Sequence, residues 1–486
     1  MNSLNLSLDE IQNFYLKKKF INKLYFYYKN KGYYNIIYTH LYNIFSGLFM
    51  IIYIIFLLNC INWNQIISIK EPTNINDIIN LKHFFKFNIF IYIFLITYII
   101  ILFFRIHNLI NDIKNYKEIK ILFNTVLNIN DYDIDLLKWN QVIEKLKEYY
   151  KDEEINIYYI NNKITTIDNY FISLIDKHII EPNNLSNLLE WNIKYCFINT
   201  IYDNNKINNN FLILNKNFYK DFEYKIICVI IVNFLFMPFI INYIIFYNLF
   251  NYGEQFYNKP KFLLSKSWSI HAKWMFRNYN ELPHEFNERI FKSYTKCNEY
   301  YEQINNKILE TFIKLILFIL SSVFVTMIFF SIINDKLLLN LYIFDNRQLF
   351  WFLGIIGSII ALLRTNINQT KKYHLKDKFK ELQTIINFIP DDWDNINNKE
   401  IGTFYKYRFI LIYKEFFNTI NAPFYLIDIY FNYKKIFLFL NEITINSSKY
   451  GHINKFSLFN NNLNMDEKQK DSLDTFNINN NNNNIL

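Results

Sequence analysis

The run LILFILSSVFVTMIFFSII, residues 315–333, decides the fold class. It contains no charged residue, and hydroxyl side chains such as Ser321, Ser322 and Thr326 are the main interruptions of its apolar character. A helix needs roughly 20 predominantly apolar residues to cross the hydrocarbon core of a bilayer. We therefore expect residues 315–333 to form a transmembrane helix.

Three other stretches predict further crossings: residues 44–61, 84–104 and 349–363. The last of these is short, but Arg364 closes it. Its Gly354 and Gly357 would permit close packing against a neighbouring helix. The chain is therefore predicted to be an all-α integral membrane protein with four transmembrane helices.

Two more apolar runs, residues 226–250 and 416–440, are interrupted by Pro238 and Pro423. Proline removes an amide donor and breaks a helix, and a broken helix at membrane depth survives only inside protein or beside a wet cavity. Basic residues flank both ends of each run, which places both ends on the cytosolic side. We expect two kinked re-entrant elements, with six crossings as the alternative.

The distribution of lysine and arginine also orients the chain. Basic clusters precede the first span and follow the second and fourth spans, and basic loops stay in the cytosol. Both termini are therefore predicted to be cytosolic.

The expected organisation is a cytosolic amphipathic segment (1–43), a first transmembrane pair (44–104), a cytosolic helical region (105–225), a re-entrant element with a signature segment (226–307), a second transmembrane pair (308–364), a cytosolic helix with the second re-entrant element (365–459) and a disordered Asn-rich tail (460–486).

The composition limits the classes of function. The chain has 486 residues, of which 52% are hydrophobic and 20% aromatic, so it is too apolar to be a disordered protein. Its net charge of +9 suits a surface facing anionic lipid better than a nucleic-acid binder. The four cysteines form no CxxC pair, and no phosphate loop, HExxH or GxSxG motif occurs. We expect no metal, no cofactor, no bond-making chemistry and no nucleic-acid partner.

The stretch SKSWSIHAKWMFRNYNELPHEF, residues 265–286, is unusually polar for this chain. NELPHEF predicts a helix start, with Asn280 as N-cap and Pro283 in the first turn. Glu285 with Arg289, and Glu288 with Lys292, have the spacing of ion pairs on one helix face. Tryptophan beside lysine and arginine is typical of a membrane–water interface, so we expect this stretch at headgroup level. A structural elbow with paired charges is the alternative.

The sequence SWSIHAKWMFRNYNELPHEFNERI, residues 267–290, resembles the W…WxxRxxNELxHE signature of the autophagy-related protein 9 family. Similar likenesses run through roughly residues 7–460, including FYLKKKFINKLYFYYKNKGYYNII, LLKWNQVIEKL, LLEWNIKYCFIN, GIIGSIIALLR, NAPFYLI and GHINKFSLFN. The resemblance implies four transmembrane helices plus re-entrant helices in a homotrimer. It implies ATP-independent phospholipid scrambling, without a chemical step, in vesicles derived from Golgi and endosomes and at the preautophagosomal membrane. It implies a lipid-transfer protein and other autophagy factors as partners.

A polar, cationic groove would lower the cost of moving a headgroup through hydrocarbon. If the chain forms such a groove, we expect the lipid phosphate to contact Lys259, Lys261, Lys266, Arg277 and Lys273. We expect Asn280, Glu281 and His284 to form the polar elbow that positions these residues. The stretch YNKPKFLLSK lacks the acidic residues that the family often has there. A membrane scaffold that moves no lipid is the rival class. A transporter or channel is disfavoured, because the four predicted spans contain no acidic residue and no internal repeat is visible.

Overall fold

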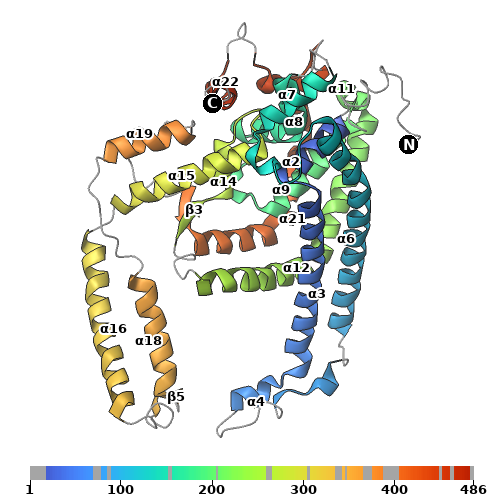
Figure 1. Cartoon of the computed structure of the whole chain (residues 1–486). Coiled ribbons are helices and arrows are strands. Elements are labelled where there is room, and N and C mark those ends of the chain that lie inside the picture. The colour runs from blue at the N-terminus through green and yellow to red at the C-terminus, as the bar shows by residue number, and fades with distance from the viewer. Residues whose placement is uncertain are drawn as a thin grey trace.

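A computed structural model shows a mostly helical chain. It describes residues 18–68, 78–84, 89–150, 156–203, 206–258, 265–303, 307–333, 342–344, 347–364, 375–386, 404–447, 451–459 and 465–481. A mostly helical body carries two pairs of upright helices that extend below it (Figure 1).

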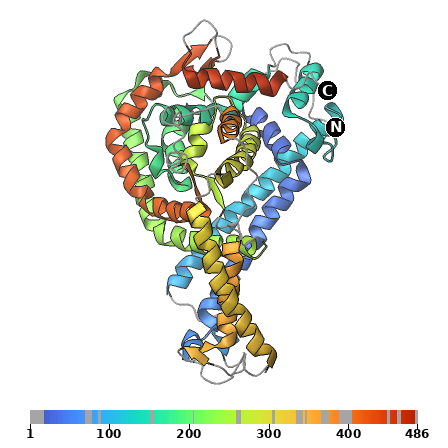
Figure 2. The ribbon, with the colours of Figure 1, turned by 90° about the vertical axis from the view of Figure 1, so that its left-hand side faces the viewer.

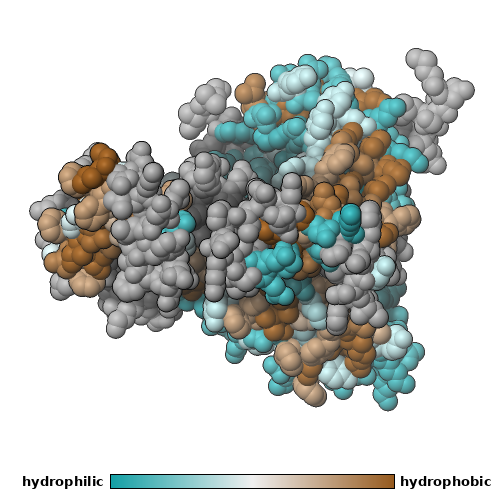
Figure 3. Space-filling view, turned by 90° about the horizontal axis from the view of Figure 1, so that it is seen from below, coloured by the Kyte–Doolittle hydropathy of each residue, from teal (hydrophilic) through white to brown (hydrophobic). Residues whose placement is uncertain are grey.

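The upright helices coincide with the four predicted crossings. They are α3 (Tyr33–Ile55, continued by a π-helical turn over Phe56–Cys60), α6 (Ile89–Ile121), α16 (Lys307–Ile333) and α18 (Leu349–Arg364). The first two pack on each other, and so do the last two. Their apolar runs became helices as predicted, because such runs satisfy their backbone groups internally. In the view from below, apolar residues form broad patches on the α16–α18 hairpin and on the larger part of the molecule (Figure 3).

The two proline-containing runs form α12 (Lys216–Asn258) and α21 (Arg408–Glu442), which pack along one another. The labelled parts of both helices lie across the direction of the upright helices (Figure 1), and Figure 2 shows both curving around the body. The expectation that proline breaks these helices is wrong: each helix continues through Pro238 or Pro423. Proline removes a single ladder hydrogen bond, and burial of Pro423 beside Ala422 and Leu426 holds the turns on either side.

By length and composition, three helical segments of the described residues could cross a membrane: Tyr33–Cys60, Lys216–Ile245 and Thr311–Ile333. A shorter apolar helix covers Leu349–Ala361. The membrane-protein character is therefore clear. The division into four crossings and two re-entrant elements stays a prediction, because the first half of α12 is itself long enough to cross.

The body has two hydrophobic clusters. One joins α8 (Ile157–Asp176) to α14 (Ile270–Phe276) and α21, with Phe171 and Phe276 fully buried. The other joins α2 (Lys18–Lys29) to α7 (Trp139–Tyr150), where the buried Trp139 ring lies 5.2 Å from the ring of Tyr25. These clusters surround the segment that the sequence singled out.

Smaller elements connect these helices. The helical ones are α4 (Trp63–Ser68), η2 (Leu81–His83), η3 (Leu122–Val126), η4 (Ile134–Leu136), η5 (Pro182–Asn184), α9 (Asn187–Ile193), η6 (Lys194–Ile198), α10 (Asn199–Ile201), α11 (Asn209–Ile213), α15 (Pro283–Gln303), α19 (Leu375–Ile386) and η8 (Lys455–Ser457). The strands pair as four antiparallel ribbons: β1 (Tyr202–Asp203) with β2 (Lys206–Ile207), β3 (Lys266–Trp268) with β6 (Tyr405–Tyr407), β4 (Tyr342–Phe344) with β5 (Arg347–Gln348), and β7 (Thr444–Ser447) with β8 (Gly451–Asn454).

The expectation of a disordered tail is wrong for residues 465–481, which include the helix α22 (Glu467–Asn481). Lys468 is buried, donates to the carbonyl of Met275 over 3.2 Å and lies 3.4 Å from the carboxylate of Asp176. The hydroxyl of Ser472 accepts the Tyr279 amide. The sequence lacked an apolar stripe because this helix docks through polar side chains.

Candidate functional site

The segment of residues 265–289 is called the signature segment. Its first residues form a strand that pairs with the strand directly before α21. Strand β3 pairs with β6, so that Trp268 lies opposite Tyr405. The indole Nε1 of Trp268 donates to the Ser293 hydroxyl over 3.1 Å, and the residue is 2% exposed. Trp274 is also buried. Both tryptophan rings therefore pack within the protein, and the position of the segment at headgroup level stays a prediction.

Arg277 belongs to a closed network of charges. Its guanidinium lies 2.8 Å from the carboxylate of Asp168, which also receives Lys194 at 3.0 Å. Lys194 in turn pairs with Glu190, whose second oxygen accepts the indole Nε1 of Trp274 over 2.9 Å. Burial alone would raise the pKa of Asp168, but the positive charges of Arg277 and Lys194 hold that pKa below its usual value. Arg277 is thus committed to a structural ion pair.

Asn280 is not the N-cap that its sequence context indicated. Its backbone adopts a left-handed conformation with φ of 59°, and the helix begins at Pro283. Its side-chain oxygen accepts from Asn162 at 3.0 Å and from Asn169 at 2.9 Å. Its side-chain nitrogen donates to the Ser457 carbonyl over 2.7 Å. Asparagine tolerates this backbone conformation better than most residues, and here it joins three distant segments.

Glu281 forms the most buried ion pair of the signature segment. Its carboxylate receives both Nε and Nη2 of Arg289 at 2.7 Å, and its side chain is 2% exposed. Arg289 also donates to the carbonyls of Phe276 and Ile386. The predicted pairing of Glu285 with Arg289 is therefore wrong, because Arg289 turns back toward Glu281. The predicted pair of Glu288 with Lys292 is confirmed at 2.7 Å.

His284 contacts the N-terminal part of the chain. Its Nδ1 lies 2.9 Å from the Tyr25 hydroxyl, and its ring lies 5.5 Å from that of Tyr28. Burial lowers the pKa of His284 to about 4, so the ring is neutral at ordinary pH. Arg277, Asn280, Glu281 and His284 therefore all have protein partners, as the structural-elbow alternative expects.

The four lysines of the predicted lipid pathway are placed differently. Lys259 and Lys261 lie outside the described residues. Lys266 lies with its ammonium 5.2 Å from the ring centre of Tyr407. Lys273 lines a pocket between the signature segment and α21. Of the eight predicted site residues, Lys273 is thus the one that this pocket brings together with other cations.

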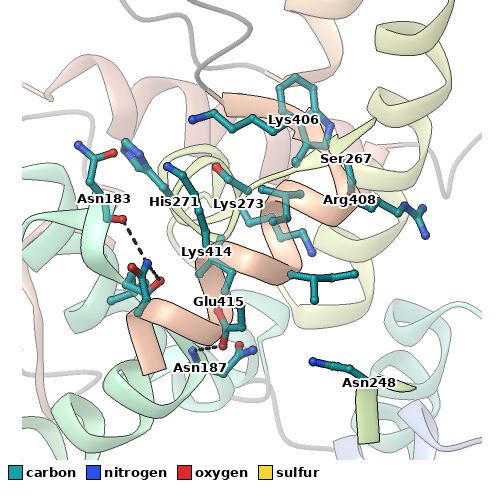
Figure 4. A pocket seen from close by; sticks show the side chains of 17 residues that line it. Asn183, Asn187, Asn248, Ser267, His271, Lys273, Lys406, Arg408, Lys414 and Glu415 are labelled. Atoms are coloured by element: carbon teal, nitrogen blue, oxygen red, sulfur yellow. Dashed lines mark hydrogen bonds between the residues drawn. The ribbon is translucent and has the colours of Figure 1, made fainter. Parts of the chain in front are cut away.

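The pocket, called the cationic pocket below, encloses about 870 Å³. Its walls come from the loop before α9, from β3 and α14, from β6 and the first turns of α21, and from Asn248 near the end of α12. Figure 4 shows His271, Lys406 and Lys273 on the upper side and Asn248 on the opposite side. The polar lining residues are Asn183, Asn187, Asn248, Ser267, Ser269, His271, Lys273, Lys406, Arg408, Lys414, Glu415 and Asn418.

Positive charge dominates this lining. Of the described residues that line the pocket, three are lysines, one is an arginine and one is an acid, Glu415, whose Oε1 accepts the Asn187 amide over 2.9 Å. Burial, then the neighbouring charge of Lys414, lowers the pKa of Lys406. Burial, then nearby charges that include Lys406 and Lys414, lowers the pKa of His271 to about 4. Mutual repulsion of this kind is relieved by a bound anion.

An exposed apolar stripe adjoins the cationic pocket on the same helix. Phe409, Tyr413 and Phe417 recur at every fourth position of α21 and are 49%, 62% and 42% exposed. Lys414 and Glu415 of the pocket occupy the positions between them. One helix therefore presents an apolar side, suited to acyl chains, next to a polar cavity.

The sequence reasoning missed most of this pocket. Lys406, Arg408 and Lys414 entered only as basic flanks of an apolar run, in the stretch YKYRFILIYKE. Their spacing was visible, but their proximity to Lys273 depends on the β3–β6 pairing. Among the described residues, no group of His, Cys, Asp or Glu could hold a metal ion.

Comparisons with known proteins agree with this architecture. The family model described as "Autophagy protein ATG9" matches residues 8–460. The chain belongs to the autophagy-related protein 9 family. It is 27% identical over 433 residues to "Autophagy-related protein 9" of Dictyostelium discoideum, and 26% identical over 451 residues to the Saccharomyces cerevisiae protein of that name.

These alignments cover 84% of this chain, but 61% of the Dictyostelium protein and 44% of the Saccharomyces protein. The cryo-EM structure of Schizosaccharomyces pombe Atg9 matches with a TM-score of 0.69 at 24% identity, covering 92% of this chain and 100% of that one. The fold of this family member is therefore that of Atg9, and its membrane character agrees with the apolar helices described above.

Proposed function

We propose that this family member scrambles phospholipids between the leaflets of vesicle and phagophore membranes during autophagosome formation, without ATP and without bond chemistry. The observation that carries the proposal is the cationic pocket beside the exposed stripe of Phe409, Tyr413 and Phe417. A phospholipid has the same division into a charged headgroup and apolar tails.

The barrier to lipid exchange is the burial of a polar headgroup in hydrocarbon, which is costly without partners. In the proposed mechanism, Lys273, Lys406 and Lys414 contact the phosphate while the tails stay against α21 and the surrounding lipid. Residues 277–289 of the signature segment do not touch the lipid; they hold β3 and α14, which carries Lys273, in place. In this mechanism, Lys259, Lys261 and Lys266 would contact the headgroup only as it approaches the pocket.

The proposal includes the assembly and setting that the family resemblance implied. The chain would have four crossings (α3, α6, α16 and α18), with α12 and α21 re-entrant and both termini cytosolic. It would act as a homotrimer in Golgi- and endosome-derived vesicles and at the preautophagosomal membrane. A lipid-transfer protein and other autophagy factors would be its partners.

A non-scrambling scaffold that recruits autophagy factors is the second candidate. It is favoured by the complete pairing of Arg277, Asn280 and Glu281, which makes the signature segment a rigid internal joint. A scaffold needs such a joint but has no need of a cationic pocket next to exposed apolar side chains.

The test is reconstitution of the full chain into liposomes that contain a fluorescent phospholipid. A membrane-impermeant quencher is added, and leakage of an entrapped dye is followed in the same vesicles. Quenching well beyond the outer-leaflet half, without leakage, supports scrambling. Quenching that stops at the outer leaflet, from folded protein, supports the scaffold.

A further inference from the structure

The cationic pocket carries more positive charge than an ordinary phospholipid headgroup can neutralise. Within the part of the chain that the structure describes, none of the ion pairs includes Lys273, Lys406 or Lys414. A zwitterionic headgroup would bring one phosphate together with an ammonium group. The phosphate would satisfy part of this charge, and the ammonium would be repelled by the remaining lysines.

The size and the neutral lining point the same way. A volume of about 870 Å³ exceeds what a single phosphate fills and lies within the roughly 300–1,000 Å³ of small-molecule pockets. Asn248 and Ser267 add neutral groups that can both donate and accept hydrogen bonds. Such groups suit the hydroxyls of a sugar-like ring.

We propose that the cationic pocket recognises a compact polyol bearing several phosphate groups, in preference to a headgroup with one phosphate. This chemistry occurs in phosphoinositide headgroups and in soluble inositol polyphosphates. The inference rests on the proposed function in one respect: it places such a lipid on the route that other phospholipids take.

The contacts follow from the placement of the side chains. Lys406 and Lys414 come from β6 and α21 and are close enough to influence each other, so one phosphate between them would relieve their repulsion. Lys273 on α14 is available to a second phosphate. Asn248 reaches the pocket from α12 and would contact a ring hydroxyl (Figure 4).

Binding is measured by thermal-shift titration of the full chain in detergent, with inositol hexakisphosphate and inositol monophosphate as soluble probes. The hexakisphosphate is expected to bind at least about tenfold more tightly, because each further charge-assisted contact adds roughly that factor. The double variant Lys406→Gln, Lys414→Gln should lose this preference. The control variant Lys147→Gln, Lys292→Gln removes two exposed lysines outside the pocket and should keep it.

Two further probes distinguish a membrane lipid from a soluble ligand. They are a short-chain phosphatidylinositol bisphosphate and its free headgroup, inositol trisphosphate. Tighter binding of the lipid identifies a membrane ligand, and equal binding identifies a soluble one; either result supports polyphosphate recognition. Equal affinity for the hexakisphosphate and the monophosphate overturns the proposal, and so does an equal loss in both double variants. Because no vesicle is needed, these outcomes are independent of scrambling, which the liposome experiment judges separately.

Discussion

The second part of the signature segment, residues 277–289, and the cationic pocket are neighbours with opposite charge balance. In the signature segment, Arg277 meets Asp168 and Glu281 meets Arg289, each within ion-pair distance. Among the described residues that line the pocket, there are three lysines and Arg408, and Glu415 is the one acid. A dense, recognisable motif can therefore be a structural joint, whereas an excess of one charge in a cavity indicates a ligand.

The variant Arg289→Met should destabilise the protein most. It leaves the carboxylate of Glu281 buried without its partner, which typically costs about 3–5 kcal/mol. The measurement is the thermal unfolding midpoint in detergent, followed by tryptophan fluorescence. The matched control is Lys292→Met on the same helix, which breaks the exposed pair with Glu288 and should cost about 0–1 kcal/mol. Equal midpoints for the two variants would contradict a structural role for the Glu281–Arg289 pair.

The variant Asn280→Ala should come next. It removes hydrogen bonds to Asn162, Asn169 and the Ser457 carbonyl, at about 1 kcal/mol for each bond, because each of these groups keeps a second hydrogen-bond partner. Asn280→Gly removes the same bonds but accepts the left-handed backbone. Its midpoint should be higher than that of the alanine variant, since a Cβ in this conformation costs roughly 1–2 kcal/mol. A glycine variant that is less stable than the alanine variant would refute this account of position 280.

Glu285 gives the signature segment a pH dependence. Burial raises the pKa of Glu285 from its usual value of 4.5 to about 7, and the nearby charges of Glu281 and Glu288 add to this increase. Because the folded state binds this proton more tightly than the unfolded state, Glu285 contributes stability below pH 4.5 that is lost as pH rises to about 7. Glu285→Gln should therefore raise the midpoint at pH 8 and flatten its decline between pH 4.5 and 7. The idea fails if wild type and variant show the same pH profile.

The smallest effect on stability is expected in the cationic pocket. Lys406→Gln removes a positive charge that lies beside Lys414, so the unfolding midpoint should stay unchanged or rise slightly. Loss of stability comparable to that of Arg289→Met would show that Lys406 is a structural residue, and would remove the contrast between the two regions.

The membrane helices were the most predictable part of the fold. An uncharged apolar run such as residues 315–333 predicts a transmembrane helix without knowledge of the rest of the fold, since all its backbone hydrogen bonds form within the run. The continuity of α21 through Pro423 was not predictable, because it depends on the packing of Ala422 and Leu426 in the body. Helix α22 was not predicted because it contacts the body through polar side chains. In an Asn-rich stretch, such polar contact positions cannot be distinguished from the other polar residues.

The candidate site was predictable only in part. The signature residues were correctly singled out, but their partners were not visible: Asp168 lies on α8, far from Arg277 in sequence. The pocket required knowledge of a three-residue strand, β6, which brings Lys406 and Arg408 next to β3. Short strand pairings of this kind leave no periodic signal in a sequence.

The scrambling rate of pocket variants in liposomes tests the central claim most directly. The triple variant Lys273→Gln, Lys406→Gln, Lys414→Gln is compared with Lys117→Gln, Lys147→Gln, Lys292→Gln, which removes the same charge from exposed positions outside the pocket. Both are first shown to match the wild-type unfolding midpoint. We predict that the control scrambles like wild type and that quenching of the pocket variant slows toward the outer-leaflet plateau. Equal rates for both variants would contradict the assignment of headgroup passage to the cationic pocket.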